Sequence, residues 1–253
     1  MTTVLLTRPE NQNDKLKSEL ELLGATVLLQ PAIEILPVES WGEVDAVVAR
    51  VGEFDWVLFT SSNGVRFFMN RLGNIKFPDS VKVGVVGNGT DDVFFECSKR
   101  RANFVPEINN AEGMLTKILT EKIDGKKFLL PRGNRGRNVL SKGIIEAGGI
   151  VEEIVVYRSV DCKVAKPEIA DQIKRGQIDW VTATSPAIAE SLVNMFGESL
   201  RKIKIISISP ITTTKLIELG FPPQTEAKET TINAIINEIL FDTEAGMDGR
   251  LRP

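Results

Sequence analysis

The residue types that could do chemistry in this chain are restricted, because its 253 residues include no histidine. Without imidazole there is no Ser-His-Asp triad, no imidazole general base and little basis for a catalytic zinc site. Chemistry must then come from hydroxyl groups, carboxylates, cationic side chains, backbone groups and Tyr157, the only tyrosine. A phenol can donate a hydrogen bond or act as a weak acid. The structural alternative for Tyr157 is an amphipathic aromatic residue that packs on a strand.

Hydroxyl groups recur at one kind of position, in a stretch that occurs twice. Residues 55–65 (DWVLFTSSNGV) return as residues 179–188 (DWVTATSPAI), at an offset of 124 positions. Each copy predicts a buried strand followed by a helix, with a Thr-Ser pair at the junction. Side-chain oxygens at such junctions cap free backbone N–H groups, and the same helix start can bind a carboxylate. The hydroxyl groups concerned are those of Thr60, Ser61, Thr184 and Ser185.

The repeat extends over most of the chain. Residues 4–9 match 128–133 and residues 24–27 match 148–151 at the same offset, whereas residues 82–90 match 204–212 at an offset of 122. Arg8 thereby corresponds to Arg132, and Thr90 to Thr212. Four similar blocks in the same order indicate an internal duplication, since chance similarity of apolar strands would explain only one.

Strands that alternate with helices predict the elements that hold these groups. The expected strands cover residues 4–7, 27–38, 56–59, 81–86, 104–106, 128–131, 151–160, 180–183 and 205–208. This order predicts an α/β protein with parallel sheets that helices cover on both faces. Ligands of such proteins bind at the carboxyl ends of the strands, where the arginine and hydroxyl positions fall. A cleft between two domains is the expected site.

The composition is that of an ordinary globular protein. With 42% hydrophobic and 26% charged residues the chain can bury a core, and a net charge of −3 gives no general nucleic-acid footprint. Cys97 and Cys162 form neither a metal set nor a disulfide framework, which fits a reducing compartment. No apolar run approaches membrane length. We expect a cytoplasmic protein with no nucleic-acid or membrane partner.

Several short stretches share their order and spacing with one known family. They are Leu5-Leu6-Thr7-Arg8-Pro9, Phe59-Thr60-Ser61, Leu130-Pro131-Arg132-Gly133 with Arg137, Val156-Tyr157-Arg158, Thr184-Ser185-Pro186, the turn at 210–216, and Ala227-Lys228-Glu229-Thr230. In these stretches, which span nearly the whole chain to Leu240, the sequence resembles the uroporphyrinogen-III synthase family.

The resemblance implies a two-domain fold in which the chain crosses between domains twice. Residues 1–35 and 162–241 would form one α/β domain, and residues 36–161 the other. A two-stranded linker near Ile33 and Val156 would join them. The repeat alone would divide the chain near Lys126. Residues 242–253 are polar and Gly-rich, and we expect them to be a disordered tail.

The resemblance also implies a reaction. The enzyme, a hydro-lyase, would close the linear tetrapyrrole hydroxymethylbilane into uroporphyrinogen III, with loss of water and inversion of the last ring. It would need no cofactor and no metal, and it would act as a monomer on this polycarboxylate substrate. The alternative is a two-domain binding protein that closes on an anionic small molecule without chemistry.

Site residues follow from the matching positions. Tyr157 corresponds to a tyrosine of the family's cleft and is the expected catalytic residue, whereas Arg8, Arg132 and Arg137 are expected to bind substrate carboxylates. Residues 126–142 contain six basic residues and no acidic residue, although a solvated surface is the simpler explanation for its two lysines at 126 and 127. The hydroxyl groups expected to bind substrate are those of Thr60, Ser61, Thr90, Thr184, Ser185 and Thr212. The family usually has Gly-Pro-Thr-Thr where this chain has Ser209-Pro210-Ile211-Thr212, so the last hydroxyl is placed at Thr212 or at the next position.

Overall fold

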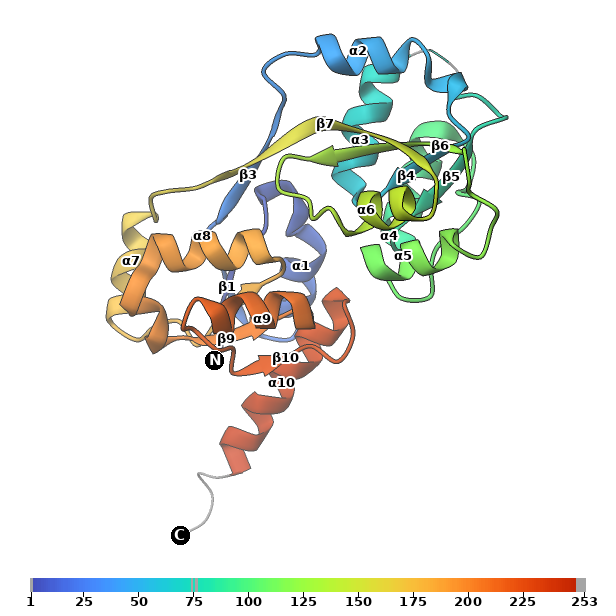
Figure 1. Ribbon diagram of the computed structural model, residues 1–253. Coiled ribbons are helices and arrows are strands. Elements are labelled where there is room, and N and C mark those ends of the chain that lie inside the picture. Colours follow the sequence, from blue (N-terminus) through green and yellow to red (C-terminus); the bar gives the residue numbers. More distant parts are fainter. Residues whose placement is uncertain (1, 74, 76, 249–253) are drawn as a thin grey trace. The chain divides into compact units, whose positions relative to one another are not determined.

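The computed structural model describes residues 2–73, 75 and 77–248. The chain divides into two compact units, Met1–Glu34 with Val160–Pro253, and Ile35–Ser159 (Figure 1). We call these unit 1 and unit 2. The chain therefore passes between the units twice, at strands β3 (Ile33–Pro37) and β7 (Ile150–Asp161). The boundaries expected from the sequence are 35/36 and 161/162.

Unit 1 is built on a parallel sheet with the strand order β10-β9-β8-β1-β2. Its strands are β1 (Thr3–Leu6), β2 (Thr26–Leu29), β8 (Trp180–Ala183), β9 (Lys204–Ser207) and β10 (Thr225–Glu226). The pairings β1–β2, β1–β8, β8–β9 and β9–β10 are parallel. The central strands are continuous apolar runs because both of their faces are buried.

Helices cover the sheet of unit 1. They are α1 (Asp14–Leu22), α7 (Pro167–Lys174), α8 (Pro186–Phe196), α9 (Pro210–Glu218) and α10 (Ile232–Asp248), with 3-10 helices η1 (Glu10–Gln12) and η3 (Gly197–Lys202). Leu16 and Leu20 of α1 pack with Ile235 and Ile239 of α10 in one core cluster. Residues 242–248 belong to α10, where the sequence analysis expects the start of a disordered tail; residues 249–253 lie outside the described part.

Unit 2 has the strand order β3-β7-β6-β4-β5. Besides β3 and β7, its strands are β4 (Trp56–Phe59), β5 (Lys82–Val85) and β6 (Lys127–Gly133). The pairings β4–β5, β4–β6 and β6–β7 are parallel. The single long strand expected at 27–38 is instead two strands, β2 in unit 1 and β3 beside β7, because the chain turns away from the first sheet at Gln30-Pro31-Ala32. The strand expected at 104–106 is one isolated bridge between Gly84 and Phe104.

The side chains of β4 show how unit 2 fills two cores. Val57 and Phe59 lie in one cluster with residues of α2 (Gly42–Val48), η2 (Val51–Glu53), α3 (Ser62–Leu72) and α4 (Asn88–Ser98). Trp56 and Leu58 lie in a second cluster with α5 (Ala111–Ile118) and α6 (Val139–Glu146). Successive side chains of a strand point to opposite faces, so helices must cover both faces of this sheet.

The repeated stretch occupies equivalent places in the two units. The repeat matches four pairs of strands: β1 with β6, β2 with β7, β4 with β8, and β5 with β9. With these pairs, the order β9-β8-β1-β2 in unit 1 is the same as the order β5-β4-β6-β7 in unit 2. The aspartate that opens each copy makes the same contact. Asp55 Oδ2 accepts a hydrogen bond from the Lys127 N–H at 2.8 Å, and Asp179 Oδ2 accepts one from the Thr3 N–H at 2.7 Å.

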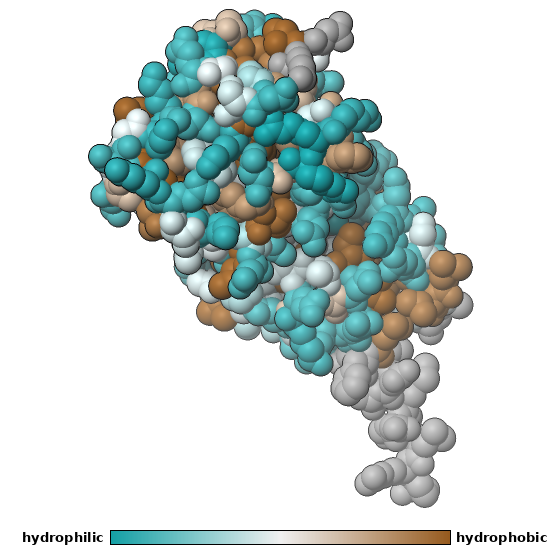
Figure 2. Space-filling model, turned by 90° about the vertical axis from the view of Figure 1, so that its right-hand side faces the viewer, coloured by the Kyte–Doolittle hydropathy of each residue, from teal (hydrophilic) through white to brown (hydrophobic). Residues whose placement is uncertain are grey.

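The surface carries mixed side chains. The face shown in Figure 2 is largely hydrophilic, with hydrophobic side chains in separate patches. Within the described residues, no helix combines the length and the hydropathy that crossing a membrane requires.

Candidate functional site

The junction of β4 and α3 places Ser61 at the carboxyl end of a central strand. Ser61 has extended backbone angles, and its Oγ accepts a hydrogen bond from the Gly64 N–H at 3.1 Å. This satisfies one of the free donors of the first helical turn. A Cβ at Gly64 would lie 3.1 Å from the Pro131 carbonyl oxygen, so the glycine allows α3 to start close to β6. Thr60, immediately before the cap, is exposed.

Unit 1 repeats this junction between β8 and α8. Ser185 Oγ accepts a hydrogen bond from the Ile188 N–H at 3.2 Å, and Pro186 occupies the first helical turn. Proline is suited to this position, because its fixed φ matches the helix and its missing N–H has no helical partner to lose. Thr184 and Ser185 are both partly exposed.

Tyr157 reaches the β4–α3 junction from β7. Its hydroxyl oxygen lies 3.2 Å from Ser61 Oγ, and either atom could be the donor. Its ring stacks on Phe67 of α3, with 5.7 Å between centroids and 25° between planes. The structure thus brings together two of the predicted site residues of unit 2, Ser61 and Tyr157, in direct hydrogen-bond contact.

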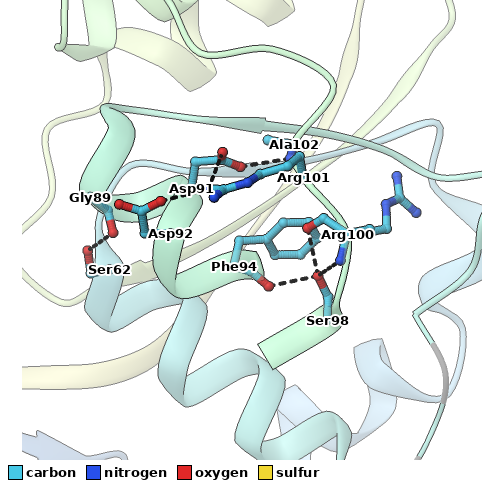
Figure 3. Close-up of polar contacts among 9 residues, drawn as sticks. All are labelled: Ser62, Gly89, Asp91, Asp92, Phe94, Ser98, Arg100, Arg101 and Ala102. Atoms are coloured by element: carbon cyan, nitrogen blue, oxygen red, sulfur yellow. Dashed lines mark hydrogen bonds and ion pairs between the residues drawn. The ribbon is translucent and has the colours of Figure 1, made fainter. Parts of the chain in front are cut away.

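The turn between β5 and α4 lies beside the same junction. Ser62 Oγ donates to the Gly89 carbonyl oxygen at 3.3 Å, which links the first turn of α3 to the first turn of α4 (Figure 3). Gly87 has φ of 80° and allows the chain to reverse there. Thr90 follows in the same turn but is only 6% exposed. This burial favours a role of Thr90 in holding the turn, and its contact with substrate stays a prediction.

Two salt bridges from Arg101 connect the start of α4 to the segment that follows this helix. Arg101 Nη1 lies 2.9 Å from Asp91 Oδ2 and 2.7 Å from Asp92 Oδ1, and Asp91 Oδ1 accepts from the Ala102 N–H at 2.8 Å (Figure 3). Acidic residues in a first helical turn are stabilised by the helix dipole. Asp91, the acidic residue of this turn, and its neighbour Asp92 thus both pair with the segment that follows α4.

Arg132 and Arg137 are both paired with acidic side chains of unit 2. Arg132 Nη1 lies 2.6 Å from Glu153 Oε1 and 2.9 Å from Asn138 Oδ1. Arg137 makes two bonds to the Glu112 carboxylate, at 2.6 and 3.0 Å. The Arg137 guanidinium holds the pKa of the Glu112 carboxyl below its ordinary value. A substrate carboxylate would therefore have to share or displace these partners.

Arg8 of unit 1 is in a different environment. Arg8 is partly buried, two residues after β1, and this partial burial lowers the pKa of its guanidinium. The partner that the structure gives it is Gln12 Oε1 at 3.5 Å, and among the described residues no acidic side chain forms an ion pair with it. The neighbouring Asn13 is fully buried, and its Oδ1 has no hydrogen-bond partner there. A buried cation without a counter-charge is stabilised by an anionic ligand.

The turn between β9 and α9 contains a hydroxyl network. Thr212 is fully buried, and its Oγ1 lies 3.2 Å from Ser209 Oγ. The next residue, Thr213, donates to Glu226 and lies 2.5 Å from Ser207 Oγ. Thr213 is the neighbouring position that the sequence pattern left open beside Thr212, whereas Ser207 and Glu226 were not expected. Glu226 pairs in register with Ser207 at the ends of β10 and β9, which only the sheet topology shows.

Other chemistry finds little support in the described residues. No three His, Cys, Asp or Glu side chains in the described ranges gather as a metal-binding set. Burial raises the pKa of both thiols, Cys97 and Cys162, which makes the nucleophilic thiolate less available.

Fold and site together define an α/β protein with two parallel-sheet units that present hydroxyl and guanidinium groups at the carboxyl ends of their strands. The family model described as uroporphyrinogen-III synthase HemD matches residues 14–237. The chain belongs to the uroporphyrinogen-III synthase family.

Comparisons with individual proteins agree with this family assignment. The uroporphyrinogen-III synthase of Chlorobaculum parvum is 29% identical over 230 residues, which are 87% of this chain and 90% of the relative. That of Synechococcus elongatus is 26% identical over 247 residues, 92% of each chain. A mutant uroporphyrinogen III synthase from Thermus thermophilus has a TM-score of 0.67 at 17% identity, covering 97% of this chain and 100% of that one. The synthetase from Helicobacter pylori has a TM-score of 0.64 at 19% identity, covering 95% and 99%. These two structures support the fold.

Proposed function

We propose that this protein closes hydroxymethylbilane into uroporphyrinogen III, with loss of water and inversion of the last pyrrole ring, as a step of tetrapyrrole biosynthesis. The observation that carries the proposal is the contact between the Tyr157 and Ser61 hydroxyl oxygens, 3.2 Å apart, at a carboxyl strand edge of a chain in this family. A two-domain binding protein without catalysis is not favoured, because the family is one of synthases.

The reaction requires little acid strength. The carbon–oxygen bond of the hydroxymethyl group breaks, the electron pair leaves with the oxygen, and the cation that remains is stabilised by the pyrrole nitrogen. The substituted carbon of the last ring bonds to this cationic carbon. Its earlier bond to the methylene bridge of the neighbouring ring then breaks, and that bridge bonds to the free α-carbon of the last ring. The free α-carbon loses its proton in this step, and the proton balances the departed hydroxide as water. We propose that Tyr157 donates a hydrogen bond to the departing hydroxyl group.

The larger task is orientation. The flexible substrate must be folded so that the substituted carbon of the last ring reacts first, and such positioning is worth up to roughly 7–11 kcal/mol in favourable cases. We propose that Arg8, Arg132 and Arg137 bind substrate carboxylates, together with the capped helix starts at Thr60-Ser61 and Thr184-Ser185. Thr90 and Thr212 stay predictions; their burial favours a role in holding the two turns.

The remaining features are expectations of the same proposal. The substrate is a linear tetrapyrrole, and the enzyme would work as a cytoplasmic monomer with no nucleic-acid, membrane, metal or cofactor requirement. A coupled assay tests the central claim: hydroxymethylbilane is supplied, and the uroporphyrin isomers are separated after oxidation. Type III is the expected product, and type I alone would reject the proposed function.

A further inference from the structure

Gly133 leaves the space that the Tyr157 ring occupies. The two residues are in register between β6 and β7, after a register shift at Arg132/Gly133. A Cβ on Gly133 would lie 2.5 Å from Tyr157 Cζ, 2.7 Å from Cε2 and 2.8 Å from the hydroxyl oxygen. All three atoms are at the far end of a side chain that can rotate. A side chain at position 133 would therefore displace the phenol while leaving the strands able to pair.

Phe67 also restrains the Tyr157 ring. It belongs to α3, the helix that Ser61 caps, and it stacks on the phenol at 5.7 Å. Stacked rings at this separation add a specific geometry beyond simple burial. Gly133, Phe67 and Ser61 thus contact the ring or its hydroxyl from β6, from α3 and from the turn before α3.

The direction of the hydrogen bond between Ser61 and Tyr157 then matters. Ser61 Oγ already accepts from the Gly64 N–H, but a hydroxyl group still has its own proton to donate. The phenol has only one proton. If Tyr157 donates this hydrogen bond to Ser61, its O–H is no longer available to a departing hydroxyl group. If Ser61 is the donor, the phenol O–H is free to point away from the protein.

We propose that Gly133 and Phe67 are positioning residues that hold the Tyr157 phenol against Ser61, and that Ser61 donates to the phenol oxygen, so that the phenol proton faces the substrate. This inference rests on the proposed role of Tyr157 in the reaction. Gly133 and Phe67 act through Tyr157 and need not touch the substrate.

The phenol can be observed directly, because Tyr157 is the only tyrosine. Labelling the protein with tyrosine carrying ¹³C at Cζ gives one ring resonance that needs no assignment. Gly133→Ala and Phe67→Leu should each move this resonance in the free enzyme. Gly42→Ala and Phe95→Leu, at positions without contact to Tyr157, serve as controls and should leave it in place. An unchanged resonance in both Gly133→Ala and Phe67→Leu would overturn the positioning claim.

A kinetic cycle tests whether the two residues act through the phenol. Displacement of a reacting group by about 1 Å can cost about 10²-fold, so Gly133→Ala should lower kcat by up to this factor with little change in KM. The Gly133→Ala/Tyr157→Phe double variant should be no slower than Tyr157→Phe alone. Losses that multiply would show that Gly133 acts independently and would reject the inference. Should Gly133→Ala fail to fold, the Phe67→Leu/Tyr157→Phe pair decides by the same criterion.

The bond direction has its own test. Ser61→Asp keeps a good helix cap, but its carboxylate can only accept hydrogen bonds, so the phenol would have to donate to it. Ser61→Thr keeps a hydroxyl group that can donate. We expect kcat to fall further in Ser61→Asp than in Ser61→Thr, whereas the added charge of the aspartate should act on KM. Equal kcat in the two variants would reject the direction. Near wild-type turnover of Tyr157→Phe would instead reject the proposed catalytic role of Tyr157. The ring resonance of Gly133→Ala and Phe67→Leu is measured without substrate, so it tests the positioning of the ring even if that catalytic role is rejected.

Discussion

The hydroxyl oxygens of Ser61 and Tyr157 lie 3.2 Å apart although 96 positions separate the residues in the chain. Ser61 follows β4 and Tyr157 lies in β7, with β6 between the two strands. The contact is possible because parallel strands bring their carboxyl ends to the same edge of the sheet.

The first prediction concerns the phenol itself. Tyr157→Phe removes the donor and keeps the ring that stacks on Phe67, so the fold should persist. General acid assistance is typically worth about 10²–10⁴-fold, and this leaving group departs easily, so we expect a loss of about 10²-fold in turnover. The product should remain type III, because orientation comes from other groups. Turnover, isomer ratio and Tm are measured together; a low Tm accompanying the lost activity would show a structural role instead.

The second prediction separates Arg8 from the other arginines. Arg8→Gln should raise the apparent KM by about tenfold or more, because a hydrogen bond to a charged group contributes about 1.5–3 kcal/mol and this guanidinium has no ion-pair partner among the described residues. Its Tm should not fall, since the variant removes a buried cation. Saturation kinetics and a melting curve test both parts. An unchanged KM with a lower Tm would show that Arg8 serves the fold.

The third prediction uses the Arg137–Glu112 pair, whose side chains are 45% and 47% exposed. Exposed charge interactions are weak, so Arg137→Ala should raise KM about two- to fivefold at low salt and less at high salt. Glu112→Gln should lower KM at low salt, because it frees the guanidinium and removes a negative charge. The comparison of KM at two ionic strengths checks this, and salt-independent effects would contradict it.

The fourth prediction concerns acid stability and Asp55. The hydrogen bond from the Lys126 side chain, and then that from the Lys127 N–H, hold the pKa of Asp55 below its ordinary value of 3.8. A carboxyl whose pKa is lowered in the folded state contributes stability above its unfolded pKa and loses it as pH falls through the folded pKa. Wild-type stability should therefore decline below about pH 4, and Asp55→Asn should decline less. Urea unfolding below about pH 4 measures the free energy of unfolding, with a substitution of the exposed Glu10, Glu10→Gln, as the control. If this free energy falls equally with pH in wild type and Asp55→Asn, Asp55 is not the group responsible.

The fifth prediction concerns packing in β5. A Cβ on Gly84 would lie 2.8 Å from Phe104 Cζ and 2.9 Å from Leu58 Cδ2. Leu58 is a core residue and Phe104 packs against the same core, so Gly84→Ala should destabilise unit 2 by about 1–3 kcal/mol. Gly42→Ala, whose nearest atom would be Ser40 Oγ at 3.8 Å, should instead be neutral or stabilising. Denaturant unfolding of both variants measures the difference, and equal stabilities would show that the Phe104 ring moves freely.

Much of the fold follows from local patterns. The apolar runs at Trp56–Phe59 and Trp180–Ala183 mark buried strands, and Ser61 and Ser185 mark the helix starts that follow. These features can be predicted because a buried parallel strand is apolar on both faces and a helix start needs a cap within a few residues. The lack of histidine likewise limits the chemistry without any structure. Near Pro31 the pattern was not sufficient, since apolar residues continue through a turn that only the pairing of β2 and β3 with different strands reveals.

The site depends on contacts between distant segments. The sequence analysis selects Arg132 and Arg137 as a basic cluster, but their carboxylate partners, Glu153 and Glu112, lie 21 and 25 positions away. Likewise, the contact of Gly133 with Tyr157 arises from a register shift between β6 and β7. The chain by itself determined which groups are available and where most of the strands and helices begin. Only the tertiary structure decided which cations are already paired, which hydroxyls are buried and what surrounds the phenol, because those properties depend on strand order and register, which local sequence does not encode.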